Sequence, residues 1–429
     1  MKKKSGGKYK ARFPKPIVTI VILLLYISSF GCKKNLVTSH KGDDAMIEQL
    51  LRKMTIDEKI GQMTQICFSS ITLNGNKELL LNDSLIREAI LTYHVGSFIS
   101  GTGTLSEWYD FISKIQKIAV KESRLGIPLM IGIDHVHGAN YINEGTILPH
   151  NITLSCSFDT VAVRMAAKIT REETLPSGIS LNFAPVLDLG VNSYWPRFYE
   201  TFGEDPLLAS QMGKVFIEEF QKKDPVTKIS LSATAKHFIG YSDPASGFDR
   251  SPSYIPMQPL YELHVPAFRA GVQAGVRAIM INSGELNGYP VHASAPIISG
   301  LLRQKLGFNG VIITDIKDID KLIELHHLAR NRKEAVKLAL DAGIDINMAC
   351  TTFEFAYWIK ELIREGSISE NRIDESVRRI LRMKYEMGLF EHPYPASVKD
   401  TDLYIKNHTY AIDLASESIV LLKNQDVLP

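Results

Sequence analysis

A carboxylate directly follows a short apolar run in the last third of the chain. The run is Val311, Ile312 and Ile313, bounded by Gly310, and it leads through one threonine into Asp315. A β-branched segment bounded by glycine is typical of a buried strand. Catalytic side chains of parallel α/β barrels lie at the carboxyl ends of strands. Asp315 is therefore a candidate nucleophile, and its alternative role is to cap the helix that follows.

Other polar residues follow other apolar runs in the same way. They are Asp134, His135 and His137 after the third run, Asp188, Arg197 and Glu200 after the fourth, Lys236 and His237 in the fifth, and Asn282, Ser283 and Glu285 after the sixth. A buried lysine is costly unless it is paired. If these groups converge on one rim, they can make charge-assisted hydrogen bonds to vicinal hydroxyls. A carboxylate nucleophile there suits glycosyl transfer, because an anion stabilises an oxocarbenium-like transition state.

The elements that must position these residues repeat eight times. Strands are expected over 63–68, 95–99, 129–133, 181–187, 232–238, 278–281, 311–314 and 344–348. Helix-length patterns separate most of them, at 105–122, 160–174, 206–221, 260–274 and 331–342. Alternating strands and helices indicate a parallel sheet, and eight repeats indicate a closed (β/α)₈ TIM-type barrel of the α/β class.

Helical patterns flank the eight repeats. One runs from residue 43 to about 62, and a helical tail covers about 353–387. We expect the barrel to occupy 43–395, and 396–429 to be a linker followed by the first strand of a second α/β domain. The apolar run 418–422 is that expected strand.

The N-terminus has the order of an export signal. Residues 1–31 carry seven cations and no acid, so the formal net charge of +2 for the 429 residues becomes −5 without them. No basic patch that would indicate a nucleic-acid partner then remains. The apolar run 17–26 follows the basic region, and small residues precede Cys32. This order predicts a cleaved signal peptide over 1–31.

Cys32 is the expected attachment point for lipid. The sequence Ser29-Phe30-Gly31-Cys32 resembles a bacterial lipobox, in which the cysteine is lipidated and becomes the mature N-terminus. We therefore expect a protein anchored to the cell envelope, at its periplasmic face or on the cell surface, with a polar tether over 32–42. The alternative is an uncleaved anchor helix, although the apolar run is short for a membrane span.

Three cysteines remain after Cys32. Cys67, Cys156 and Cys350 are odd in number and widely spaced, which is typical neither of a disulfide framework nor of a zinc site. We expect buried free thiols.

Five ordered motifs resemble glycoside hydrolase family 3, the exo-acting β-glucosidase group, over roughly 43–429. They are GIDHVHG at 132–138, PRFYETFGEDP at 196–206, KHFIGY at 236–241, SGFDRSP at 246–252, and GFNG at 307–310, which leads into Asp315. The resemblance implies a retaining hydrolase that releases a terminal β-linked sugar, glucose first, from an oligosaccharide, with no cofactor and no metal.

The resemblance also implies a role for each matching residue. Asp315 is the expected nucleophile, and the glycosyl unit is held by Asp134, Arg197, Lys236 and His237. Glu285 is an additional expected binding residue.

Two departures from the family pattern bear on function. The family nucleophile is usually followed by tryptophan and then an acid, whereas this chain has Ile316 and Lys317. That change removes a stacking platform for the sugar and alters the charge beside the nucleophile. The family's general acid/base usually comes from a second α/β domain, and 416–429 resembles only the opening of that domain.

Three other functions fit some of the same residues. A metal-dependent amidohydrolase would use His135, His137, Lys236, His237 and Asp315. That class has its histidine pair on the first strand, whereas here the pair follows the third, and a structural role is favoured for His135 and His137. A Schiff-base aldolase would use Lys236, although no phosphate-binding glycine loop accompanies it. The last alternative is a sugar-binding lipoprotein or a catalytically impaired fragment.

Overall fold

The computed structural model describes residues 41–72, 82–396, 402–426 and 428. The expected signal peptide, Cys32 and the tether up to residue 40 lie outside the described residues. Contacts divide the chain into a unit of residues 1–44 and a unit of residues 45–429. The second unit contains every strand described below. No helix in the described part of the chain has the length and hydrophobicity of a membrane span.

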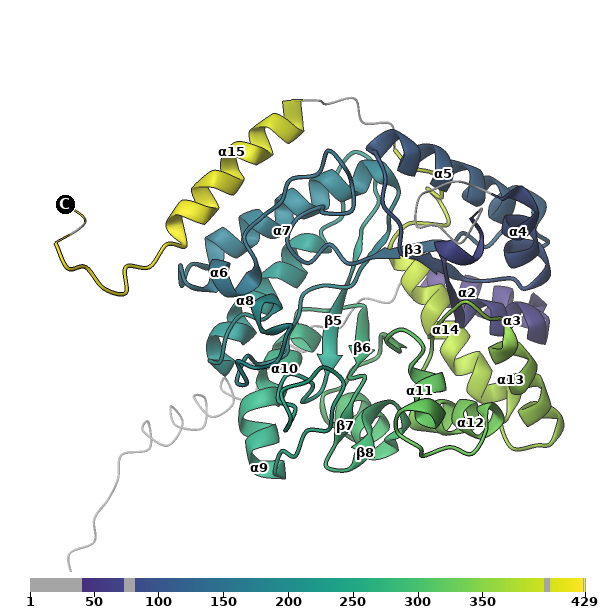
Figure 1. Ribbon diagram of the computed structural model, residues 1–429. Helices are drawn as coiled ribbons and strands as arrows, with labels where there is room; N and C mark the ends of the chain where they lie inside the picture. Colours follow the sequence, from purple (N-terminus) through teal and green to yellow (C-terminus); the bar gives the residue numbers. More distant parts are fainter. Residues whose placement is uncertain (1–40, 73–81, 397–401, 427, 429) are drawn as a thin grey trace, which may run out of the picture. The chain divides into compact units, whose positions relative to one another are not determined.

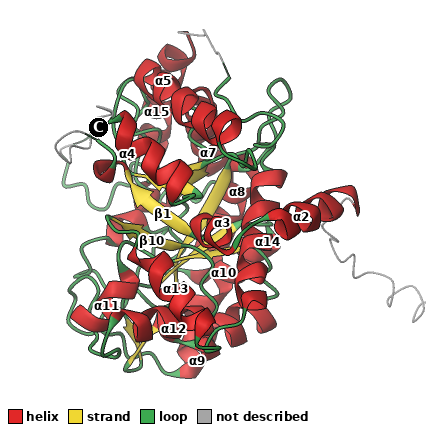
Figure 2. Cartoon of the chain, turned by 90° about the vertical axis from the view of Figure 1, so that its right-hand side faces the viewer, coloured by secondary structure: helices red, strands yellow, loops and turns green. Residues whose placement is uncertain are grey.

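Eight parallel strands form the sheet at the centre of the second unit (Figures 1 and 2). They are β1 Thr64–Cys67, β2 Ser97–Ile99, β3 Met130–Ile133, β4 Leu181–Asn182, β5 Ser232–Phe238, β6 Ala278–Ile281, β9 Val311–Ile313 and β10 Asn347–Cys350. Their order is β10-β1-β2-β3-β4-β5-β6-β9, and a parallel bridge between Ile313 and Ile346 joins its two ends. The expected (β/α)₈ barrel is thus confirmed, and its last strand covers 347–350 where 344–348 was predicted.

Helices surround this sheet, and Figure 2 shows them in red around the yellow strands. The longer ones are α2 Lys41–Lys53, α3 Ile56–Gln62, α5 Leu105–Lys117, α7 Thr160–Thr174, α8 Pro206–Phe220, α10 Val265–Gln273, α11 Asp318–Glu324, α12 Arg332–Ala342, α13 Glu354–Arg364, α14 Glu370–Glu386 and α15 Asp402–Glu417. Shorter α-helices are α4 Asp83–Arg87, α6 Asn151–Ser155 and α9 Met257–Pro259. The π-helical segments are η3 Glu88–Thr92, η4 Ile118–Glu122, η7 Leu260–His264 and η9 Pro296–Lys305. The 3₁₀ turns are η1 Phe68–Ser70, η5 Leu175–Ser177, η6 Phe198–Glu200 and η8 Val291–Ala293, and a small hairpin pairs β7 Glu285–Leu286 with β8 Tyr289–Pro290.

Capping residues set several helix boundaries. Asp159 begins α7, and Asp205 begins α8 with proline at its first position, as the sequence pattern predicts. The helical pattern predicted over 43–62 forms two helices. Thr55 and Glu58 form a capping box that begins α3, so the pattern is divided into α2 and α3.

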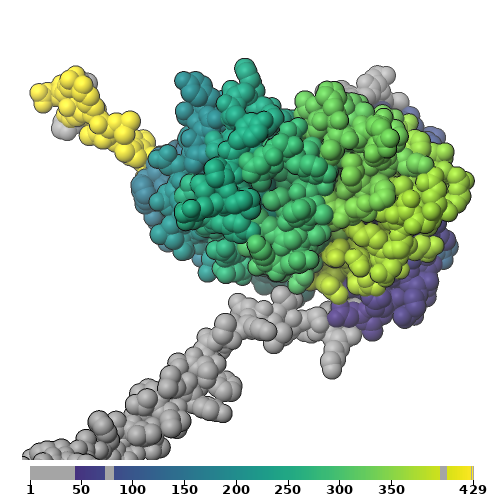
Figure 3. All heavy atoms as spheres, turned by 90° about the horizontal axis from the view of Figure 1, so that it is seen from below, coloured from purple at the N-terminus to yellow at the C-terminus, as the bar shows by residue number. Residues whose placement is uncertain are grey.

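Helix α14 closes the amino-terminal end of the strands with a buried lysine. Lys384 is fully buried and donates to Gln62 Oε1 at 2.7 Å, Gly96 O at 3.0 Å and Pro128 O at 2.7 Å. These acceptors precede β1, β2 and β3. Burial lowers the pKa of Lys384 to about 7. Figure 3 shows purple α2 against yellow-green α14, where Arg378 pairs with Glu48. The opposite end of the strands is left for a site.

The expectation of buried free thiols is wrong. Cys67 and Cys350 form a disulfide between the carboxyl ends of β1 and β10, with a Cα–Cα distance of 4.4 Å. They are 283 residues apart in sequence and become neighbours only because the barrel places its first and last strands side by side. Cys156 is free, as predicted, but it is exposed.

The predicted strand at 418–422 is not formed in this chain, and the second domain that it was predicted to open stays a prediction. Residues 418–426 form no strand, and the side chains of Ile419 and Leu422 are 79% and 92% exposed. A strand needs a neighbour for its backbone hydrogen bonds, and no described strand pairs with this segment. The preceding residues form α15, which the sequence pattern did not predict, and Asn407 in α15 donates to Glu173 Oε1 in α7 at 2.9 Å.

Candidate functional site

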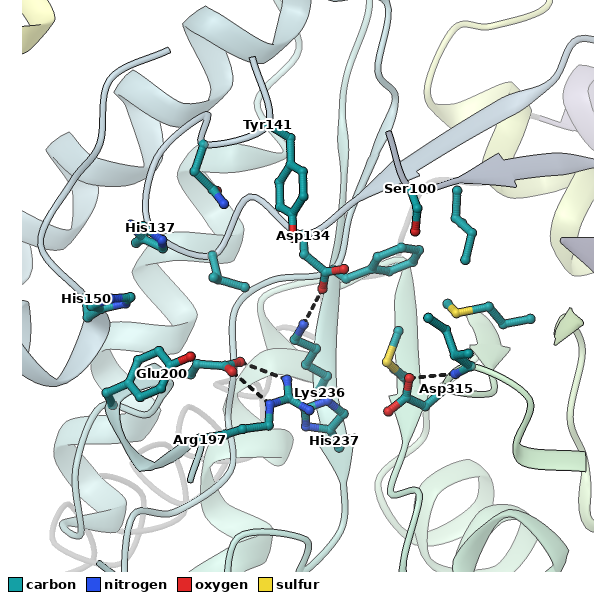
Figure 4. A pocket seen from close by; sticks show the side chains of 18 of the residues that line it. Ser100, Asp134, His137, Tyr141, His150, Arg197, Glu200, Lys236, His237 and Asp315 are labelled. Carbon is teal, nitrogen blue, oxygen red and sulfur yellow. Dashed lines mark hydrogen bonds and ion pairs between the residues drawn. The ribbon is translucent and has the colours of Figure 1, made fainter. Parts of the chain in front are cut away.

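The carboxyl ends of the strands surround a cavity of about 300 Å³ (Figure 4). Its charged and polar lining combines anions, cations and hydroxyl-bearing or imidazole side chains: Ser100, Asp134, His137, Asn140, Tyr141, His150, Arg197, Tyr199, Glu200, Lys236, His237, Arg250 and Asp315. Ile99, Val136, Phe183, Met280, Ile316 and Met348 supply the apolar part. Five of the six predicted site residues therefore meet in one cavity.

Lys236 reaches this cavity from β5 and pairs with Asp134, which follows β3. Lys236 Nζ lies 2.6 Å from Asp134 Oδ1, and the lysine side chain is 3% exposed. Gly132 in β3, two residues before Asp134, leaves room for Phe183, because a Cβ on Gly132 would lie 2.6 Å from the Phe183 ring. The ion pair offsets the cost of burying the ammonium group.

Arg197 and Glu200 form a two-pronged pair beside it. Arg197 Nε and Nη2 donate to the two carboxylate oxygens of Glu200, each at 2.8 Å. Burial opposes ionisation of Glu200, but the hydrogen bonds and charge of Arg197 outweigh it and lower the pKa of Glu200. The η6 turn sets this spacing, because it places the two side chains three residues apart on one turn.

His237 is fixed by Asp188. Asp188 Oδ2 lies 2.8 Å from the His237 backbone nitrogen and 2.7 Å from Nδ1. Burial, with help from Arg197 and Lys236, lowers the pKa of His237 well below its ordinary value, so the imidazole is neutral near pH 7. Burial also raises the pKa of Asp188 to about 8. The histidine thus faces the cavity as a neutral hydrogen-bonding group.

Asp315 lies on the opposite side of the view in Figure 4 from His137 and His150. Its Oδ1 accepts the Ile316 N–H at 2.6 Å, and its Oδ2 lies 3.3 Å from Arg250 Nη2. Burial and the neighbouring Asp318 carboxylate raise the pKa of Asp315, and Arg250 opposes them. The alternative capping role is wrong, because α11 has Lys317 at its N-cap and no side-chain cap.

Glu285 lies outside this cavity. It is in β7, where its Oε1 lies 3.0 Å from His326 Nδ1, and it does not line the pocket. Ile316, at the position where the family pattern has tryptophan, does line the pocket and is 38% exposed. Tyr141, His150 and Arg250 also line the cavity, although no role was predicted for them. Arg250 could have been found, because it lies in the SGFDRSP motif at 246–252. Tyr141 and His150 lie in loops that contain no recognised motif residue pointing to them.

The structure bears on two of the alternative functions. His135 is fully buried and its Nδ1 lies 2.9 Å from Thr174 Oγ1, the structural role favoured above. His137 instead lines the cavity. Among the described residues, no three His, Cys, Asp or Glu side chains gather as metal ligands. The Lys236 ammonium is held by Asp134, whereas a Schiff base requires a free amine.

Comparisons with known proteins identify relatives over most of the chain. The family model "Glycosyl hydrolase family 3 N terminal domain" matches residues 55–383. A lysosomal β-glucosidase of Dictyostelium discoideum is 41% identical over 90% of this chain and 49% of its own length. A periplasmic β-glucosidase of Salmonella typhimurium is 34% identical, with the same two shares. The chain thus spans about half the length of these relatives.

A solved structure gives the same result. The crystal structure of a β-glucosidase from Listeria innocua in complex with glucose superposes with a TM-score of 0.79 and 31% identity. The superposition covers 90% of this chain and 53% of that one. The likeness therefore extends over the whole barrel.

Replacing Glu200 tests the buried ion pair. Glu200→Gln should lower the free energy of unfolding by about 2–3 kcal/mol, because it leaves the largely buried Arg197 without its partner. Glu218→Gln is the control: Glu218 is 39% exposed and 3.9 Å from Lys214, so its loss should cost at most about 0.5 kcal/mol. Urea denaturation measures both.

The stability difference between wild type and Glu200→Gln should also depend on pH. The pKa of Glu200 is lower in the folded protein than in the unfolded chain, so its contribution is present above the unfolded pKa and is lost as pH falls. The gap between wild type and Glu200→Gln should therefore shrink below about pH 4. Equal costs for the two variants at neutral pH would contradict this account.

Proposed function

Because the chain belongs to glycosyl hydrolase family 3, we propose that the whole protein is a retaining, exo-acting glycoside hydrolase that releases a terminal β-linked sugar. The single observation that carries this proposal is the cavity in which Asp315 faces Asp134, Arg197, Lys236 and His237. Glucose is the proposed sugar, and the relatives named as β-glucosidases support it.

The cations, the carboxylate and the imidazole of the cavity would hold the glycosyl unit. Arg197 and Lys236 have donor groups for hydroxyl oxygens, and Asp134 accepts from hydroxyl groups. His237 is fixed by Asp188 in one orientation, so it can recognise a hydroxyl without reorganising. Because these groups are already paired before substrate enters, little side-chain ordering is needed on binding.

Asp315 is the proposed nucleophile. Its carboxylate would attack the anomeric carbon and form a covalent glycosyl-enzyme ester while the bond to the leaving oxygen breaks and that oxygen takes a proton. Water would then hydrolyse the ester. A retaining mechanism places the two carboxyl groups about 5–5.5 Å apart, so the acid must reach over the rim of the barrel.

The proton donor is proposed to come from polypeptide beyond the barrel. Asp134 and Glu200, the other carboxylates that line the cavity, are held by Lys236 and Arg197 and are poorly placed to release a proton. We therefore propose that the barrel covers 43–395 and that a second α/β domain begins within 396–429. The 429 residues alone would then bind sugar but catalyse its hydrolysis poorly. This corresponds to the alternative in which the chain is a catalytically impaired fragment.

An extracytoplasmic location is supported by the Cys67–Cys350 disulfide and by the periplasmic relative. We propose in addition that lipid on Cys32 holds the protein at the envelope. Cys32→Ser should then move it from the membrane fraction to the soluble fraction on fractionation of the expressing cells, with Cys156→Ser as the control. Unchanged retention of Cys32→Ser would indicate a plain anchor helix.

Covalent labelling tests the nucleophile. A 2-deoxy-2-fluoro-β-glucoside with a dinitrophenyl leaving group should label the protein once, and peptide mapping should place the label on Asp315. The fluorine slows both formation and hydrolysis of the glycosyl-enzyme ester. The dinitrophenolate leaving group restores the rate of formation only, so the ester accumulates. Asp315→Asn should remain unlabelled. A label on Asp188 or Glu285, with none on Asp315, would refute the proposed role.

A further inference from the structure

Arg250 joins the loop after β5 to the carboxylate at the end of β9. Its Nη2 lies 3.3 Å from Asp315 Oδ2, and its side chain lines the cavity. Among the described residues, Arg250 is the cation that makes a direct ion pair with Asp315. The Oδ2 atom is the one not occupied by the Ile316 N–H, so both oxygens of the carboxylate are held.

Two further side chains aim this guanidinium. Asp249 Oδ2 accepts from Arg250 Nη1 at 2.5 Å, and Asp249 Oδ1 accepts the indole N–H of Trp195 at 3.1 Å. Trp195 is almost completely buried, so its indole ring is held in place. It therefore fixes the Asp249 carboxylate, which in turn orients the Arg250 guanidinium. The Arg250 backbone has φ +62°, which is uncommon for a residue other than glycine and persists where the surroundings impose it.

The other charges around Asp315 are already engaged. Lys321 donates to Asp318 Oδ1 at 2.9 Å, Ser283 Oγ at 3.0 Å and Ile316 O at 2.6 Å. Arg197 is held by Glu200. The charged and titratable groups that act on Asp315 are Asp318 and Lys321 in α11, Arg197 in the loop after β4, and Tyr241 and Arg250 in the loop after β5. Lys236 and His237 in β5 line the same cavity, and Asp249 contacts Arg250.

We propose that Arg250 is a positioning residue that keeps Asp315 ionised and fixes its Oδ2, with Asp249 and Trp195 orienting the guanidinium. This inference rests on the proposed role of Asp315 as nucleophile. It assigns control of the nucleophile's ionisation to a loop of the barrel itself. The burial of Asp315 and the charge of Asp318 both favour the protonated form, which cannot attack, so a cation in contact with the carboxylate is needed to offset them.

The rate of covalent labelling against pH tests the proposal on the 429-residue chain. The probe is the dinitrophenyl 2-deoxy-2-fluoro-β-glucoside, and the readout is intact mass against time. Dinitrophenolate leaves without a proton, so the measurement does not depend on a general acid. In wild type the rate should rise with pH to a plateau, with a midpoint that reports ionisation of Asp315.

Removing the cation should move that midpoint upward. An opposite charge in contact lowers a carboxyl pKa by about 1–3 units, so Arg250→Gln should shift the midpoint up by about one unit and reduce labelling about tenfold below it. Arg250→Lys keeps a charge but loses the planar guanidinium that contacts Asp249 through Nη1 and Asp315 through Nη2, so it should shift the midpoint less and still lower the plateau. Arg330→Gln, which replaces an arginine with an 87% exposed side chain, should match wild type.

The outcomes separate the two proposals. If wild type is labelled on Asp315 and folded Arg250→Gln has the wild-type midpoint, the pair is only structural and this inference is overturned. If circular dichroism shows that Arg250→Gln is unfolded, Arg250→Lys provides the test. A labelling midpoint and plateau of Arg250→Lys that both equal those of wild type would then overturn the inference. If wild type is not labelled on Asp315, the proposed nucleophile and the role of Arg250 fall together.

Discussion

Lys236 lies in the longest strand of the sheet with 2% of its surface exposed, and its ion pair with Asp134 makes that position tolerable. A buried ammonium without a partner would be neutral or would oppose folding. The same constraint applies to Arg197, which Glu200 holds with two hydrogen bonds, and to Asp315, which Arg250 contacts. Each charge that could bind or attack a substrate therefore carries a partner that fixes its position.

The barrel makes this pairing possible because it brings distant segments to one end. Lys236 and Asp134 are 102 residues apart, and Arg250 and Asp315 are 65 apart.

The two ends of the strands have different roles. At the amino-terminal end three amide carbonyl oxygens hold the side chain of Lys384, so its role is structural. At the carboxyl end cations and anions alternate around an open cavity.

Much of the fold and part of the site could be predicted from local sequence. The eight strands are short apolar runs, and the caps at Asp159 and Asp205 are local signals. The residues at strand ends, such as Asp134 and Asp315, could be found because a strand end is visible in the pattern. Pairing between distant segments could not be found, since Cys67 and Cys350 meet only after the barrel closes. The 418–422 run shows the same limit, because β-branched residues alone do not supply a neighbouring strand.

Residues in loops were the other gap. Arg250 and Tyr141 reach the cavity from loops, where no periodicity indicates which way a side chain points. Glu285 also follows a strand, as Asp134 and Asp315 do, but it lies in the β7–β8 hairpin beside His326 and outside the cavity, so its binding role stays a prediction. Sequence position relative to a strand end was thus a guide to residues within a strand or directly after it, whereas Arg197 lies well beyond the end of β4 and was predicted from the motif at 196–206.

The central claim is that this barrel holds the sugar pocket and the nucleophile but not the general acid. A paired assay on the folded 429-residue chain tests it most directly, with nitrophenyl β-glucoside against cellobiose. Proton donation to the leaving group is typically worth 10²–10⁴-fold in rate, and a nitrophenolate needs it far less than a sugar alkoxide. The account predicts residual turnover of the aryl glucoside, abolished in Asp315→Asn, and none of cellobiose. Comparable turnover of both substrates would contradict it, because the acid would then have to lie within these 429 residues.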